Sequence, residues 1–131
     1  MNTNIQNAMK ELFGHSCLGY CYAYLALKTD NVKTLTEYFM NGWLNGYIDD
    51  DGFVSKPVQY LKSMGLKCRD ISAPKINQLS QLPEGEYAVE YRNPAGGSHF
   101  VVANKKGVIF DPSYPSNSVK NNIILSYRKL I

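Results

Sequence analysis

Two cysteines four residues apart lie in the stretch GHSCLGYCYAYLALK, where His15 precedes Cys17 by two residues and Cys21 follows it by four. Much later in the chain, His99 begins the run HFVVA and Asp111 ends the run VIFD. An imidazole that is oriented by a carboxylate can activate a thiol for attack on a carbonyl carbon. These residue types therefore predict a Cys-His-Asp triad, if the fold brings them together.

Each cysteine also has two ordinary alternatives. Free cysteine is among the most commonly buried residues, so either thiol taken alone is better explained as part of a core. A metal site would need His15, Cys17, Cys21 and Cys68 as ligands. This alternative is weak, because the chain has no C-x-x-C pair and Cys68 lies about fifty residues away in a strand-like run. We expect no metal ion and no cofactor.

The composition predicts one folded domain over residues 1–131. Hydrophobic residues make up 44% of the chain and charged residues 19%, which is typical of a globular protein. The net charge of +3 is scattered, with no basic run longer than Lys105 and Lys106, so nucleic acid is not an expected partner. No segment resembles a signal peptide or a membrane span, and three cysteines suit free thiols in a reducing cytosol. We expect a cytoplasmic protein with no membrane partner.

Four helices are predicted in the first half of the chain. Apolar residues at helical spacing indicate helices over NIQNAMKELF and VKTLTEYFMNGW, the second ending at Asn41 and Gly42. The almost wholly apolar run from Cys17 to about Lys28 indicates a buried helix with Ser16 as its N-cap. At the front of this helix, the helix dipole favours a thiolate on Cys17.

The fourth helix and the sheet region follow. SKPVQYLKSMG predicts a helix with Ser55 as N-cap, Pro57 in the first turn and Gly65 as the stop signal. Beyond Gly65, strands are indicated by LKCRDI, EYAVEYR, SHFVVANKKGVIFD and NIILSYRKLI. Helices followed by strands predict an α+β fold, in which the N-terminal helices pack on a C-terminal antiparallel sheet of at least three strands.

The hairpin HFVVA-NKKG-VIFD determines whether the histidine and the aspartate meet. Gly107 after two lysines predicts a type I turn with Gly107 in the left-handed position, which makes a G1 bulge and pairs Asn104 with Val108. Side chains alternate along a strand, so this register places His99 and Asp111 on one side of the hairpin. A plain two-residue turn at the lysines would place them on opposite faces.

The cysteine at the front of a buried helix, followed by GSHFVV and VIFDPS, resembles the papain-like cysteine peptidase superfamily. The pattern is similar in particular to compact bacteriocin-processing peptidases and to small papain-like domains of phages and mobile elements. The resemblance covers most of the chain and implies a papain-like fold acting on a peptide or protein substrate. It implies Cys17 as the nucleophile, His99 as the general base and Asp111 as the residue that orients the imidazole.

The nucleophile and the oxyanion donor remain open. CYAY at Cys21 resembles the run around the nucleophile of papain itself, so Cys21 is an alternative to Cys17. The family places a glutamine six residues before the nucleophile, but that position is Glu11 for Cys17 and His15 for Cys21. A glutamate repels an oxyanion and a histidine can donate to it, which favours Cys21 with His15 as donor. Gln6 lies eleven residues before Cys17.

Two functions are compatible with this pattern. The first is a cysteine peptidase or related thiol hydrolase that cleaves a peptide or isopeptide bond; deamidases, transglutaminases and amidases use the same triad. The second is a catalytically inactive papain-like binding domain, in which the cysteines are core residues. The missing glutamine is the main support for the second function. Reactivity of one thiol near neutral pH distinguishes the two.

Overall fold

The computed structural model describes residues 13–131, which form a mixed α+β fold. The first half contains the helices α2 (Cys17–Leu27), α3 (Val32–Leu44) and α4 (Pro57–Ser63). The second half contains β1 (Ile71–Ser72), η1 (Leu79–Gln81), β2 (Tyr87–Arg92), β3 (Ser98–Asn104), β4 (Gly107–Phe110), α5 (Asn117–Asn121), β5 (Ile124–Tyr127) and β6 (Lys129–Leu130). The α+β prediction is confirmed, and the short helices η1 and α5 are additions to it. The helix predicted over NIQNAMKELF lies outside the described residues, except for Phe13.

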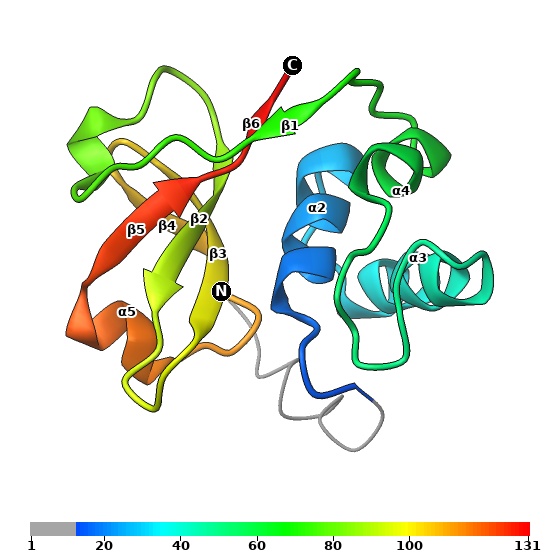
Figure 1. The fold of residues 1–131 in the computed structure, drawn as a ribbon, viewed down its shortest axis with the longest axis horizontal. Helices are drawn as coiled ribbons and strands as arrows, with labels where there is room; N and C mark the ends of the chain where they lie inside the picture. The colour runs from blue at the N-terminus through cyan, green and yellow to red at the C-terminus, as the bar shows by residue number, and fades with distance from the viewer. Residues whose placement is uncertain (1–12) are drawn as a thin grey trace.

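The sheet and the helices form two halves that lie side by side, with α2 facing the sheet (Figure 1). Four strands pair antiparallel in the order β4-β3-β2-β5, and β1 pairs with β6 in a separate small sheet. The prediction of at least three antiparallel strands beneath the helix that begins at Cys17 is therefore confirmed. This arrangement places the first turn of α2 near the first residues of β3.

Helix α2 is buried on most sides, as its apolar sequence predicts. It approaches α3 so closely that a Cβ atom on Gly19 would lie 2.6 Å from the ring of Phe39. The helix ends where Lys28 adopts a left-handed conformation with φ 56°. Ser16 occupies the N-cap position, but its side chain makes no capping hydrogen bond. Its buried Oγ has no hydrogen-bond partner within the described part of the chain.

Two helix boundaries differ from the prediction. Helix α3 continues through Asn41 and Gly42 to Leu44, because Gly42 lets the ring of Tyr60 pack against the helix. A Cβ atom there would lie 2.6 Å from that ring. Lys56, not Ser55, occupies the N-cap position of α4. The Ser55 hydroxyl instead donates a hydrogen bond to the carbonyl of Tyr47 at 3.2 Å. In both cases a tertiary contact overrides a local signal.

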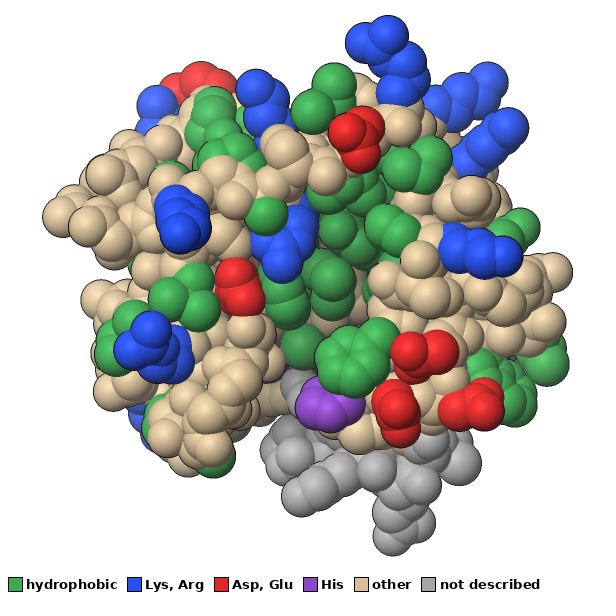
Figure 2. Space-filling view, viewed as in Figure 1, with side chains coloured by type: hydrophobic (Ala, Val, Ile, Leu, Met, Phe, Trp, Pro, Cys, Tyr) green, Lys and Arg blue, Asp and Glu red, His purple; other side chains and the backbone are tan. Residues whose placement is uncertain are grey.

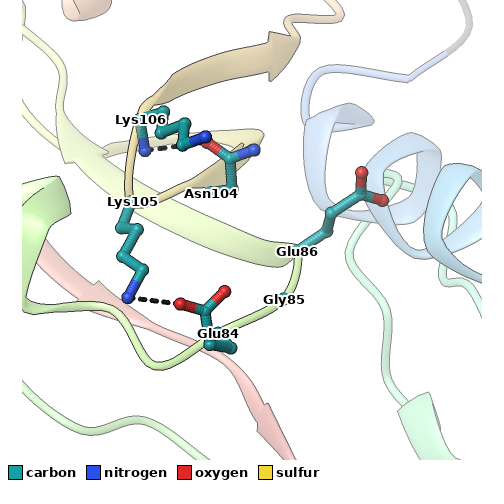
Figure 3. A pocket seen from close by; sticks show the side chains of 6 residues that line it. All are labelled: Glu84, Gly85, Glu86, Asn104, Lys105 and Lys106. Carbon is teal, nitrogen blue, oxygen red and sulfur yellow. Dashed lines mark hydrogen bonds and ion pairs between the residues drawn. The ribbon is translucent and has the colours of Figure 1, made fainter.

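The hairpin of β3 and β4 has a different turn from the predicted one. Asn104 pairs with Gly107 around a two-residue turn, and its side-chain oxygen accepts the amide hydrogens of Lys106 and Gly107. Figure 3 shows the hydrogen bond from Lys106. Gly107 has φ 159°, far from the left-handed helical value near 57°. Figure 3 also shows Lys105 of the turn paired with Glu84. The predicted G1 bulge at Gly107 is wrong.

A bulge nevertheless occurs one step further along this hairpin. Ala103 lies opposite Val108, whereas the preceding residue, Val102, lies opposite Phe110, so Ile109 is the extra residue. The extra residue restores the register that a bulge at the turn would have produced. The predicted consequence, that His99 and Asp111 share one side of the hairpin, is confirmed by their direct contact.

The two faces of the four-stranded sheet contribute to two separate cores. Ala88, Phe100 and Val102 point to the helices and belong to the larger core, while Val89 and Val101 point to the opposite face. Hydrophobic side chains also line a hollow between the sheet and the helices on the face shown in Figure 2.

Among the described residues, no helix combines the length and apolar character needed to cross a membrane.

Candidate active site

His99 and Asp111 form a buried hydrogen-bonded pair. The Nε2 atom of His99 lies 2.7 Å from Oδ1 of Asp111, and the two residues are only 3% and 1% exposed. His99 is the second residue of β3, where it lies opposite Tyr91 of β2, and Asp111 follows the last residue of β4. Two neighbouring strands therefore hold the imidazole and the carboxylate against each other.

The surroundings of Asp111 keep its carboxyl group ionised. Oδ1 also accepts the amide hydrogen of Ser113 at 2.9 Å, and Oδ2 accepts the hydroxyl hydrogen of Ser116 at 2.7 Å. Burial alone would raise the pKa of Asp111, but the hydrogen bonds from His99 and Ser116 lower it below its ordinary value. A stable negative charge therefore lies beside the imidazole.

That negative charge favours a protonated imidazole. Burial alone would lower the pKa of His99, but its interactions with Asp111 and with the thiol of Cys17 raise the pKa to about 9. Because Nε2 is engaged by Asp111, Nδ1 is the ring nitrogen left for the thiol. A protonated imidazole next to a thiol favours a thiolate-imidazolium pair, which is the reactive form in cysteine nucleophiles.

The structure places the two candidate nucleophiles differently. Cys17 is the first residue of α2, interacts with His99 and lines a surface groove. Cys21 lies one turn further along the helix with no exposed surface. Burial raises the pKa of the Cys21 thiol well above its ordinary value, and nearby Cys17 and Asp111 raise it further. Cys21 therefore lies deeper in the core than Cys17.

The groove beside Cys17 has a volume of about 360 Å³. Its wall from the helical half contains Gly14, His15, Cys17, Leu18, Phe53 and Val54. Its wall from the sheet half contains Asn93, Gly96, Gly97, Ser98 and Phe100. The groove therefore runs between the two halves of the fold, and Cys17 is one of the residues that line it.

His15 lies on the same groove wall as Cys17. Its exposed imidazole stacks on Phe53, with ring centroids 4.3 Å apart. Its backbone N–H donates a hydrogen bond to the carbonyl of Asp51 at 2.8 Å. The loop that contains Phe53 therefore holds both the backbone and the ring of His15. Glu11 and Gln6, the other positions considered for an oxyanion donor, lie outside the described residues.

The metal-ligand set considered from the sequence does not assemble. Within residues 13–131, no group of three or more histidine, cysteine, aspartate or glutamate side chains is close enough to hold a metal ion. His15 stacks on Phe53, and Cys68 lies beside β1 in the outer part of the helical core. The structure brings together Cys17, His99 and Asp111, and leaves Cys68 apart from them.

Sequence reasoning missed the serine that bonds to Asp111. Ser116 is the N-cap of α5, and its Oγ accepts the amide hydrogen of Val119 at 3.3 Å. A serine that precedes a short polar helix is a recognisable N-cap signal. Its contact with Asp111 depends on the loop of residues 112–116, which no local pattern specifies. Phe53, which holds His15, was missed for the same reason.

Comparison with protein-family models, with curated proteins and with solved structures found no match to this chain. The chemical assignment therefore rests on the residues and their geometry.

Proposed function

We propose that this protein is a thiol hydrolase with a papain-like fold that cleaves a peptide or isopeptide bond. The observation that carries the proposal is the buried 2.7 Å contact between His99 and Asp111, with the thiol of Cys17 next to the same imidazole at the wall of a groove. If Cys17 were only a core residue, its packing would explain neither the neighbouring imidazole of His99 nor the groove beside it. A reducing compartment such as the cytosol suits the mechanism, because it keeps Cys17 reduced.

In the first half of the reaction, the sulfur of Cys17 attacks the substrate carbonyl carbon and forms a C–S bond, and the electron pair of the C=O bond moves to oxygen. When the intermediate collapses, the C–N bond breaks and His99 donates its proton to the leaving amine. The product is an acyl-thioester on Cys17. Asp111 remains ionised throughout and holds the imidazole in place.

In the second half, His99 takes a proton from water as the water oxygen attacks the thioester carbonyl carbon. The C–S bond then breaks, the acid product leaves, and the thiolate-imidazolium pair is restored. A deamidase follows the same steps on a side-chain amide, and a transferase replaces water with an amine. The triad supports all three, and we favour hydrolysis because water is always available to an open groove.

The developing oxyanion needs hydrogen-bond donors near Cys17. We assign one donor to the backbone N–H of Cys17, because the first amides of an α-helix lack intrahelical partners. We assign the second to the imidazole N–H of His15, which shares the groove wall with Cys17. The sequence favours His15 as a donor for Cys21; because His15 and Cys17 line one groove, we assign it the same role towards Cys17.

The alternative is an inactive binding domain that retains the fold. It is favoured by the absence of a glutamine six residues before either cysteine and by the low exposure of Cys17, 7%. In this alternative the groove binds a peptide segment without cleaving it, and no thiol is activated.

Alkylation of the intact protein by iodoacetamide, followed by mass spectrometry, tests the proposal. We expect Cys17 to label much faster than a small free thiol near neutral pH, and labelling to be lost in Cys17→Ser but retained in Cys21→Ala. His99→Gln should slow the labelling of Cys17, while Cys68→Ala, which removes the third free thiol, should leave it unchanged. Fast labelling that survives in Cys17→Ser but not in Cys21→Ala transfers the role to Cys21. Slow labelling of every thiol favours the binding domain.

A further inference from the structure

Ser116 contacts the carboxylate oxygen of Asp111 that faces away from the imidazole. Oδ1 of Asp111 is occupied by Nε2 of His99 at 2.7 Å and by the amide of Ser113 at 2.9 Å. Oδ2 accepts the Ser116 hydroxyl at 2.7 Å. The carboxylate is therefore bonded at both oxygens, and a rotation about its Cβ–Cγ bond would break contacts at both ends.

The direction of the Ser116 hydroxyl hydrogen follows from its second contact. A serine hydroxyl has one hydrogen to donate and can also accept. Its Oγ accepts the amide hydrogen of Val119 at 3.3 Å, so the hydroxyl hydrogen is free to point at Oδ2 of Asp111. The N-cap of α5 thus holds the serine in the orientation that serves the carboxylate.

We propose that Ser116 is a positioning residue of the triad, whose hydroxyl fixes the rotation of the Asp111 carboxylate so that Oδ1 faces His99. The proposal rests on the proposed function, because orientation of His99 matters for catalysis only if Cys17 is the nucleophile. Ser116 is not among the residues that line the groove beside Cys17. It acts through Asp111.

A cavity of about 210 Å³ adjoins this contact and determines the choice of variant. It is lined by Asp111 and Ser116 together with Val108, Tyr114 and Val119. The cavity is large enough for a water molecule, which could replace a deleted hydroxyl in a small variant. Ser116→Val puts two methyl groups where the hydroxyl stood, so that a water molecule cannot take the position of the hydroxyl itself. Ser116→Thr has nearly the same shape and keeps the hydroxyl, so the two variants differ mainly in the hydrogen bond.

The test measures the titration of His99 by NMR and the labelling of Cys17 by iodoacetamide in the full-length protein. The chain has two histidines, so the His15→Gln variant assigns the two imidazole signals. We expect the titration midpoint of His99, near 9 in the unaltered protein, to fall towards 6.5 in Ser116→Val and to remain in Ser116→Thr. Labelling of Cys17 near neutral pH should slow by about 10- to 100-fold in Ser116→Val only, as expected for loss of an orienting partner.

Ser116 also caps α5, so its replacement removes an N-cap as well as the contact with Asp111. The variant Asn31→Ala, which removes the N-cap of another helix, is the control for this effect. The Asn31 side chain caps α3 by accepting the amide hydrogen of Thr34 at 3.0 Å, away from the triad. This variant should lose stability without moving the His99 midpoint. If Ser116→Val does not fold, Ser116→Ala carries the same expectation with a smaller effect.

Three results overturn the proposal in distinguishable ways. Fast labelling of Cys17 with an unchanged or raised His99 midpoint in Ser116→Val removes the positioning role and leaves the proposed function intact. An equal shift of the midpoint in Asn31→Ala assigns the effect to general destabilisation. Slow labelling of Cys17 in the unaltered protein removes Cys17 as the nucleophile of the proposed function, and the role of Ser116 with it.

Discussion

Gly52 lies so close to His15 that a Cβ atom on Gly52 would be 2.3 Å from the carbonyl oxygen of His15. Gly52 also has φ 92°, a conformation that residues with side chains rarely adopt. The loop that carries Phe53 therefore reaches the segment before Cys17 only because residue 52 has no side chain. The wall of the groove depends on this contact between two backbones.

We predict that Gly52→Ala destabilises the protein more than Gly65→Ala does. Gly65 has nearly the same φ, 91°, but a Cβ atom there meets no atom within 4 Å, so this control measures the backbone strain alone. The additional loss in Gly52→Ala should be about 1–3 kcal/mol of unfolding free energy, typical of overpacking against a rigid neighbour. Urea denaturation of the two variants measures it, and equal losses would contradict the close contact.

The raised pKa of His99 predicts a pH-dependent contribution to stability. A group whose pKa is raised by folding stabilises the folded state fully below its unfolded pKa, and this contribution disappears as the pH rises through the folded pKa. For His99 the window lies between 6.5 and about 9, and corresponds to on the order of 3 kcal/mol. The difference in unfolding free energy between the unaltered protein and His99→Gln should therefore shrink across this window. Urea denaturation at both ends checks this, and a constant difference would contradict the pairing with Asp111.

Removal of the His15 imidazole should separate acylation from alkylation. His15→Ala should slow formation of the acyl-enzyme from p-nitrophenyl acetate by about 10²- to 10³-fold, the usual cost of losing one oxyanion donor. Alkylation of Cys17 by iodoacetamide forms no oxyanion, so its rate should not change. His15→Gln keeps an N–H donor and should recover part of the acylation rate. Equal slowing of both reactions would indicate that His15 acts on the thiol or the fold, not on the oxyanion.

The sequence alone determined the order of the main elements. The apolar run after Ser16 has no polar face, so a helix there must be buried, and the change after Gly65 from helical spacing to short β-branched and aromatic runs requires a sheet. Both signals are local and do not depend on distant partners. The residue types at Cys17, His99 and Asp111 likewise suggested a thiol, an imidazole and a carboxylate acting together, but left the choice between Cys17 and Cys21 open.

Only the tertiary structure decided how these residues meet. The turn at Asn104 differs from the predicted one. His99 and Asp111 share a side of the hairpin because a bulge lies at Ile109. The pairing of the two strands, and not the turn residues, determines the position of this bulge. The depth of Cys21 and the contact of Ser116 with Asp111 also depend on segments far apart in the chain. Spacing along a sequence predicts which face a side chain occupies, but register, bulges and close backbone contacts arise from packing between elements.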